Sequence, residues 1–144
     1  MPVPETNSIL QSALVDLIDL SLLGKQAHWN VHGPNFRSVH LQLDEVIDSL
    51  RIWSDDVAER LAAVGGAPDG RSGAVAQASQ VETITAGPIL VEDVVRQFTD
   101  RLTSTSRRIE AKLTELDQDM PSQDLLIEIV TGLDKAAWMF RAQL

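Results

Sequence analysis

The sequence predicts an all-α fold in which four long helices form a bundle. Four segments carry apolar residues at steps of three and four, the period of a helix that buries one face. No segment shows the alternating pattern of a half-buried strand. The long connection over residues 65–90 suits a bundle whose second and third helices run parallel, because that arrangement needs a crossover.

The first helix is expected to begin at Asn7 or Ser8, since either residue can cap a helix, and to reach about Val31. Two prolines disfavour helix in residues 1–7, so we expect a short arm there, and it contains no basic residue. The apolar positions of this helix cover more than one face. They are Ile9, Leu10, Ala13, Leu14, Leu17, Ile18, Leu20, Leu22 and Leu23. A subunit interface and a tightly enclosed central position would both explain that width.

The second helix is expected over about residues 36–64. A Gly-Pro pair ends the preceding helix, Asn35 can cap the new one, and Gly65 stops it. The core positions repeat at helical steps. They are Val39, Leu43, Val46, Ile47, Leu50, Val57 and Leu61.

The crossover contains the helix-compatible run AVAQASQ between clusters of Gly, Pro and Ser, so we expect it to have structure of its own. The third helix is expected over about residues 91–116. Its core positions are Val94, Val95, Phe98, Leu102, Ile109 and Leu113. Pro121 and Ser122 mark the start of a fourth helix, over about residues 123–143. Its core positions are expected to be Leu126, Ile127, Val130, Leu133, Ala137, Trp138 and Phe140.

The composition is that of an ordinary globular protein, with 144 residues, 44% hydrophobic and 23% charged, which suits one domain over residues 1–144. The lack of cysteine excludes disulfides, thiolate zinc sites and cysteine nucleophiles. The formal net charge of −9 disfavours nucleic acid and anionic membranes and favours cations. No signal peptide and no membrane-spanning run is recognisable, so we expect a soluble cytoplasmic protein.

Candidate metal ligands recur at helical spacing on the second helix. His40 with Asp44, and Asp55 with Glu59, are i,i+4 pairs, so each pair shares one helix face. The two pairs point the same way but lie roughly 16 Å apart along the axis, too far to share one ion. A two-fold axis would bring the first pair of one chain to the second pair of another, with His28 joining the histidine end.

Two imidazoles and three carboxylates favour Fe, Mn or Zn over softer metals. We hypothesise that the site binds Fe(II) and passes its electrons to hydrogen peroxide or oxygen. Two simpler interpretations of these residues stay open at this point. The histidines could be structural residues held by hydrogen bonds, and the carboxylates could form a solvated acidic helix face.

A specific set of motifs carries a family resemblance. The chain contains KQAHWN, then GPNF, VH, LD and DDVAER at characteristic separations, and it ends with GLDKAAWMF. This set strongly resembles the Dps family of miniferritins over nearly the whole chain. The resemblance implies a ferritin-like four-helix bundle with a short extra helix in the crossover. It also implies a hollow dodecamer that oxidises Fe(II), preferably with hydrogen peroxide, stores ferric mineral and limits oxidative damage.

The resemblance also implies residue roles. His28, His40 and Asp44 match the family's iron ligands on one subunit. Asp55 and Glu59 match the pair that the two-fold partner supplies. The family's motifs therefore agree with the two-fold arrangement inferred from spacing alone.

Further positions have less specific matches. Trp29 matches a tryptophan beside the site that could trap stray oxidising equivalents, although core packing is an equal alternative, and packing is the better interpretation of Trp53. The family's acidic pores, through which iron enters, lie near the start of the last helix. Asp119 and Asp124 are the best pore candidates here, and a solvated acidic turn is the alternative.

DNA binding is expected to be weak or absent, because no Lys or Arg precedes Lys25 and members that bind DNA commonly use a Lys-rich tail. Two alternative functions remain: an architectural nucleoid protein with a minor iron role, and a cage reused for a hydrolytic reaction. A ferric mineral that stays bound to the protein would favour iron storage over both alternatives.

Overall fold

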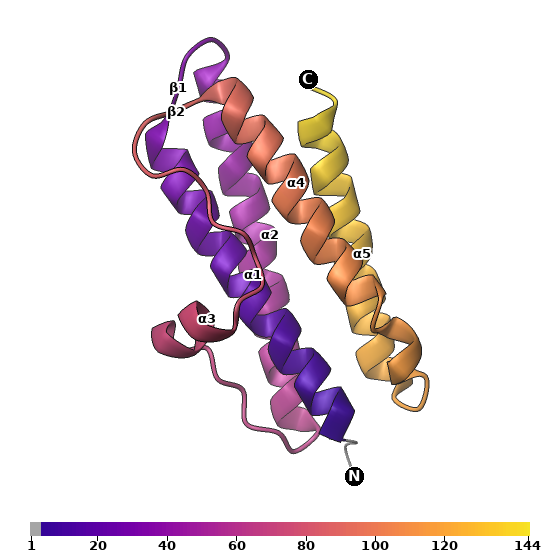
Figure 1. The fold of residues 1–144 in the computed structure, drawn as a ribbon. Helices are drawn as coiled ribbons and strands as arrows, with labels where there is room; N and C mark the ends of the chain where they lie inside the picture. Colours follow the sequence, from indigo (N-terminus) through magenta and orange to yellow (C-terminus); the bar gives the residue numbers. More distant parts are fainter. Residues whose placement is uncertain (1–3) are drawn as a thin grey trace.

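The computed structural model describes residues 4–144, and within them the chain forms four long helices in two antiparallel pairs (Figure 1). α1 (Pro4–Asn30) pairs with α2 (Phe36–Ala63), and α4 (Val91–Glu110) pairs with α5 (Met120–Arg141). A short helix, α3 (Ser72–Ala78), lies in the crossover between α2 and α4. This architecture confirms the predicted four-helix bundle with an extra crossover helix.

Two short strands, which the sequence did not predict, fix the direction of the third long helix. β1 (Val31–His32) follows α1, and β2 (Ile89–Leu90) precedes α4. The strands pair in parallel, Val31 with Ile89 and His32 with Leu90. Since α2 starts just after β1 and α4 starts just after β2, the two helices begin at the same end of the bundle and run parallel (Figure 1).

Three features differ from expectation: the start of α1, the cap of α2, and the turn from α4 into α5. α1 begins at Pro4, so residues 4–7 are helical, whereas residues 1–3 of the expected arm lie outside the described residues. Proline suits a first helical position, because the first backbone N–H groups of a helix have no intrahelical partner.

The single domain over residues 1–144 stays a prediction.

The second difference concerns Asn35. It precedes α2 as its N-cap residue, but its side chain makes no capping hydrogen bond, so the predicted side-chain cap is wrong. Its backbone is left-handed, with φ 66°, a conformation that asparagine tolerates better than most residues. Asn35 therefore serves the turn by its backbone.

The third difference is at the end of α4, which stops at Glu110. The chain then tightens into η1 (Leu113–Leu116), a 3₁₀ helix that buries Leu116 in the core. α5 starts three residues earlier than expected, with Asp119 as its N-cap accepting a hydrogen bond from the Ser122 N–H. The tight turn replaces the last turn and a half of the predicted third helix.

The core lies between the two helix pairs and contains most of the predicted positions. Ile127 and Trp138 are corrections, because 44% and 53% of these residues are exposed. Each lies about 100° around α5 from a neighbouring core residue, Leu126 or Ala137, which turns it away from the core. Ile129 is buried instead.

The crossover covers one flank of α1 through a buried polar cluster. The Asp16 carboxylate, 3% exposed, accepts hydrogen bonds from the Gln80 N–H at 2.9 Å and from Arg108 Nε on α4 at 3.2 Å. Ser79 donates to Asp19 Oδ2 at 2.6 Å. Asp16 thus connects α1, the crossover and α4.

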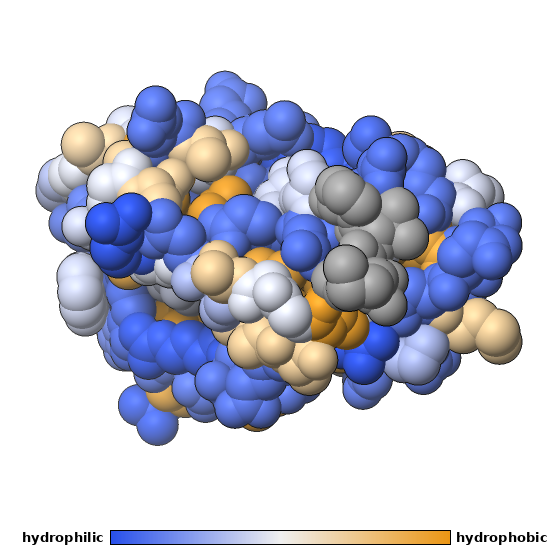
Figure 2. All heavy atoms as spheres, turned by 90° about the horizontal axis from the view of Figure 1, so that it is seen from below, coloured by the Kyte–Doolittle hydropathy of each residue, from blue (hydrophilic) through white to orange (hydrophobic). Residues whose placement is uncertain are grey.

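Figure 2 shows the end of the bundle that carries the start of α1 and the turn into α5, and this face is mostly hydrophilic with some apolar residues near its middle. Across residues 4–144, no helix combines the length and apolarity needed to cross a membrane.

Candidate metal centre

The two histidines expected as ligands lie side by side where α1 ends and α2 begins. His28 belongs to the last turn of α1, and His40 lies just over one turn into α2. Their rings stack with centroids 3.6 Å apart and planes inclined by 14°. The close packing of α1 on α2 allows this contact, and Gly24 contributes to it, because a Cβ there would lie 2.6 Å from Ile47 Cγ1.

Reciprocal hydrogen bonds hold both rings. His28 Nδ1 lies 2.8 Å from the carbonyl oxygen of His40, and His40 Nδ1 lies 2.7 Å from the carbonyl oxygen of His28. A carbonyl oxygen only accepts, so each Nδ1 carries the hydrogen and donates it. In the neutral ring this leaves the lone pair on Nε2, the arrangement in which a second-shell carbonyl orients a metal-binding histidine.

Asp44, one helical turn after His40, completes this half of the candidate site. Its Oδ1 atom lies 3.5 Å from His28 Nδ1 and 2.7 Å from Lys25 Nζ. The hydrogen bond from Lys25 lowers the pKa of the Asp44 carboxyl against partial desolvation, and the charge of Lys25, with that of either imidazole when it is protonated, lowers this pKa further. Asp44 therefore favours the carboxylate form that a metal ligand needs.

The second pair lies further along the same helix. Asp55 and Glu59 are exposed on α2, and the 15 residues from His40 to Asp55 correspond to a rise of about 22 Å. Within residues 4–144, no group of three or more His, Asp or Glu side chains is placed to hold a metal ion. The structure thus brings together His28, His40 and Asp44 but leaves Asp55 and Glu59 apart from them. A shared site between two chains stays a prediction.

The two tryptophans near the site differ in their surroundings. Trp29 is 71% exposed, so it does not pack in the core of the chain, and that alternative is wrong. Trp53 packs against the core, and its ring contacts the Gly132 backbone so closely that a Cβ there would lie 2.3 Å from Cζ2. The interpretation of Trp53 as a packing residue agrees with this contact.

The two pore candidates also differ. Burial raises the pKa of Asp119, but hydrogen bonds from Ser122 and Arg60, with the Arg60 charge, outweigh it, so the pKa lies below its ordinary value. Arg60 Nη2 lies 2.8 Å from Asp119 Oδ1 and thereby connects α2 to the start of α5. Asp124 is exposed on the first turns of α5. Asp119 has a structural role as a helix cap, and a pore role for either residue stays a prediction.

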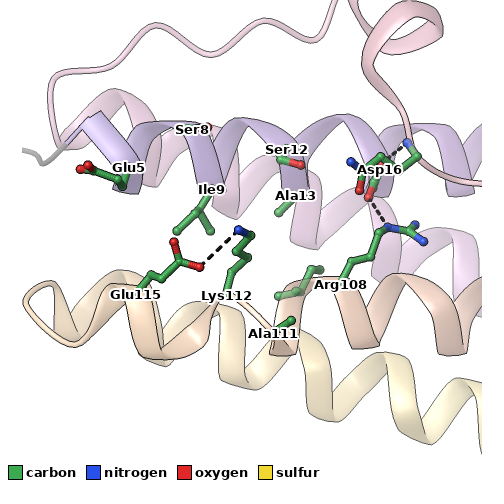
Figure 3. A pocket seen from close by; sticks show the side chains of 12 residues that line it. Glu5, Ser8, Ile9, Ser12, Ala13, Asp16, Arg108, Ala111, Lys112 and Glu115 are labelled. Carbon is green, nitrogen blue, oxygen red and sulfur yellow. Dashed lines mark hydrogen bonds and ion pairs between the residues drawn. The ribbon is translucent and has the colours of Figure 1, made fainter.

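A cavity of about 550 Å³ between α1 and the end of α4 contains none of the expected ligands (Figure 3). Four of its charged side chains form two ion pairs, Asp16 with Arg108 and Lys112 with Glu115 at 3.3 Å, and Glu5 is a further charged residue of the lining. Ile9 and Ala13 supply apolar surface. The candidate metal centre is therefore separate from this cavity.

Lys25 is the residue near the site that the sequence reasoning did not single out. It lies three residues before His28 in the motif KQAHWN, which places the two side chains on one face of α1. That i,i+3 spacing was a usable signal, but only the packing of α1 on α2 shows that the lysine reaches Asp44.

The antiparallel helix pairs, the long crossover and the paired histidines define a ferritin-like protein, and a ferritin-like domain model matches residues 7–144. The DNA protection during starvation protein of Mycolicibacterium smegmatis is 37% identical over 143 residues, 94% of this chain and 75% of the relative. The chain belongs to the Dps family of the ferritin-like proteins. This confirms the resemblance found in the motifs.

Two further similarities help to define the family. The fine tangled pili major subunit of Haemophilus ducreyi is 37% identical over 139 residues, covering 94% of this chain and 72% of the relative. The structure of Dps from Microbacterium arborescens in the high iron form matches with a TM-score of 0.91 and 31% identity, covering 99% of this chain and 97% of that one. Family membership supports the general role of an iron-storing miniferritin.

Proposed function

We propose that the protein oxidises Fe(II) at sites shared between two chains and stores the ferric product inside a hollow dodecamer. Iron is the substrate, and hydrogen peroxide or oxygen is the oxidant. With peroxide, two Fe(II) ions each give one electron, the O–O bond breaks, and two protons are taken up to form two water molecules. Oxidising iron in pairs avoids the one-electron cleavage that releases hydroxyl radical, which would protect the cell against oxidative damage.

The reciprocal hydrogen bonds between His28 and His40 are the observation that carries this proposal. They orient two imidazoles with Nε2 free for a metal, beside the carboxylate of Asp44. Nitrogen and oxygen ligands of this kind suit iron. Asp55 and Glu59 of a second chain would complete the set, and Trp29 would lie at the same site as a trap for stray oxidising equivalents.

A mixing experiment tests whether the site is shared. His40→Ala and Glu59→Ala are each expected to lose most peroxide-driven Fe(II) oxidation, measured by stopped-flow absorbance at equal iron loading. When the two variants are unfolded, mixed in equal amounts and reassembled, about one quarter of the sites should regain one intact half from each chain. The double variant carrying both substitutions on one chain is the control and should stay inactive.

No recovery on mixing would contradict sharing between chains, provided that mass photometry shows mixed assemblies of the wild-type mass. Retained oxidation in both single variants would contradict the ligand assignment itself. The wild-type mass also tests the proposed dodecamer.

Iron would enter through acidic pores that include Asp119 and Asp124. Asp124→Asn should slow iron uptake into the mineral while leaving zinc binding at the histidines unchanged. Asp119→Asn is less informative, because Asp119 also caps α5 and pairs with Arg60.

We propose a cytoplasmic protein that binds DNA weakly or not at all. The net charge of −9 for each chain leaves few counterions to be released from phosphates. A gel shift with metal-free protein in moderate salt should show unretarded DNA. Retarded DNA would contradict this proposal and would favour association with the nucleoid.

A further inference from the structure

Lys25 reaches the candidate metal ligand Asp44 from the neighbouring helix. Its Nζ atom lies 2.7 Å from Asp44 Oδ1, a short charge-assisted hydrogen bond. The side chains are 27% and 39% exposed, so the pair is partly shielded from water.

The position of this bond distinguishes it from an ordinary surface ion pair. Oδ1 is the same Asp44 oxygen that lies 3.5 Å from His28 Nδ1. The ammonium therefore binds the Asp44 oxygen that lies nearest to His28. Lys25 precedes His28 by one turn of α1, so both side chains extend from one helix face toward α2.

A metal ion and an ammonium group compete for such an oxygen. The lone pairs that accept the hydrogen bond from Lys25 are those that a divalent cation would use. Lysine has a flexible stem of four carbons and a strongly hydrated head, so it can release the carboxylate and move into solvent without a change in the backbone.

We infer that Lys25 is a positioning residue that acts as an internal competing cation and weakens divalent-metal binding at the His28, His40 and Asp44 cluster. This inference rests on the proposed function, because it assumes that the cluster binds metal. Without a bound metal ion, the ammonium neutralises the charge of Asp44. A divalent cation that binds the imidazoles displaces it.

The competition affects how tightly metals bind rather than which metal binds. Every divalent cation must displace the same ammonium, so affinities should fall by a common factor. A weakened site is occupied only while free metal is plentiful, which suits a centre that passes ions onward rather than retaining them.

Zinc binding to the assembled protein tests this inference without any redox reaction. Lys25→Leu removes the charge and keeps most of the side-chain volume, Lys25→Gln is a polar neutral alternative, and Lys25→Arg retains the charge. The control is Lys135→Leu, which removes an exposed lysine from α5. Affinity for Zn²⁺ is measured by titration against a competing chelator at fixed ionic strength.

Both neutral Lys25 variants should bind Zn²⁺ about fivefold more tightly than the wild type, because the metal ion no longer has to displace a partly exposed ion-pair partner from Asp44. Lys25→Arg should restore weak binding, and Lys135→Leu should leave the affinity unchanged. Unchanged or weaker binding in both neutral variants would overturn the inference, as would an equal gain in Lys135→Leu.

His40→Ala separates this inference from the proposed function. Loss of zinc binding in His40→Ala, with no gain in the Lys25 variants, would overturn the role of Lys25 alone. Zinc binding that does not depend on His40 would overturn both the proposed site and this inference.

Discussion

Replacing Gly24 by alanine should disturb the candidate metal centre without changing any of the proposed ligands. Gly24 is buried on α1, and an added Cβ would lie 2.6 Å from Ile47 Cγ1 and 3.1 Å from Ile47 Cδ1 on α2. Carbon atoms in contact prefer about 3.5–4 Å, so the helices must separate by about 1 Å unless Ile47 moves. The same separation would stretch the hydrogen bonds between His28 and His40, which are 2.7–2.8 Å long.

The expected loss of stability follows from two opposing effects. Adding a methyl group to a well-packed contact between helices lowers the free energy of unfolding by about 1–3 kcal/mol. Alanine in a helix interior recovers about 1 kcal/mol relative to glycine. Gly24→Ala should therefore lower the free energy of unfolding by about 0–2 kcal/mol. Disturbing the carbonyl groups that orient both imidazoles should weaken zinc binding about 10- to 100-fold.

Urea unfolding at fixed protein concentration measures the first effect, because assembly makes apparent stability depend on concentration. Gly73→Ala is the matched control: no atom lies within 4 Å of its added Cβ, so it should be neutral or stabilising. In Gly24→Ala with Ile47→Ala, the new methyl group enters space that the isoleucine vacates, so the double variant should cost less than the two singles together. Gly24→Ala that matches Gly73→Ala in stability and retains wild-type zinc affinity would refute this reasoning.

Three further predictions concern stability. Asp16→Asn leaves Arg108 without its buried anionic partner and should lower the free energy of unfolding by about 1–3 kcal/mol, with faster hydrogen exchange in the crossover. The pKa of Asp119 is below its ordinary value in the folded chain. Its ionised carboxylate therefore stabilises the fold above about pH 3.8, and this stabilisation is lost as pH falls through the folded-state pKa. Asp119→Asn should thus be less stable than the wild type at pH 7 and equal to it in strong acid, by urea unfolding; a constant difference would contradict this. Phe98→Ala should cost about 3–5 kcal/mol in the same assay, since Phe98 is buried against Phe140; a loss under 1 kcal/mol would contradict its core role.

Helical periodicity was enough to predict the bundle, because each long helix buries a face whose spacing is visible in the sequence. The same spacing placed Asp55 and Glu59 one turn apart. It failed for Ile127 and Trp138, since hydrophobicity alone does not show on which side of the core stripe a residue lies.

Contacts between helices account for what the sequence could not reveal. The ring stacking of His28 and His40 depends on how closely α1 approaches α2, and no local pattern encodes that distance. The bond from Lys25 to Asp44 has the same origin. The strand pair β1 and β2 escaped prediction because two-residue strands have no detectable alternation.

The crossed bonds between the two histidines make the orientation of each ring depend on the backbone of the other helix. A slide or tilt of α1 against α2 would therefore disturb both rings together, and neither could be misaligned by itself. Substitutions where α1 packs against α2 should thus seldom disturb one imidazole while leaving zinc binding by the other intact. Such variants should instead fall into two groups, with the histidine pair either intact or lost as a unit.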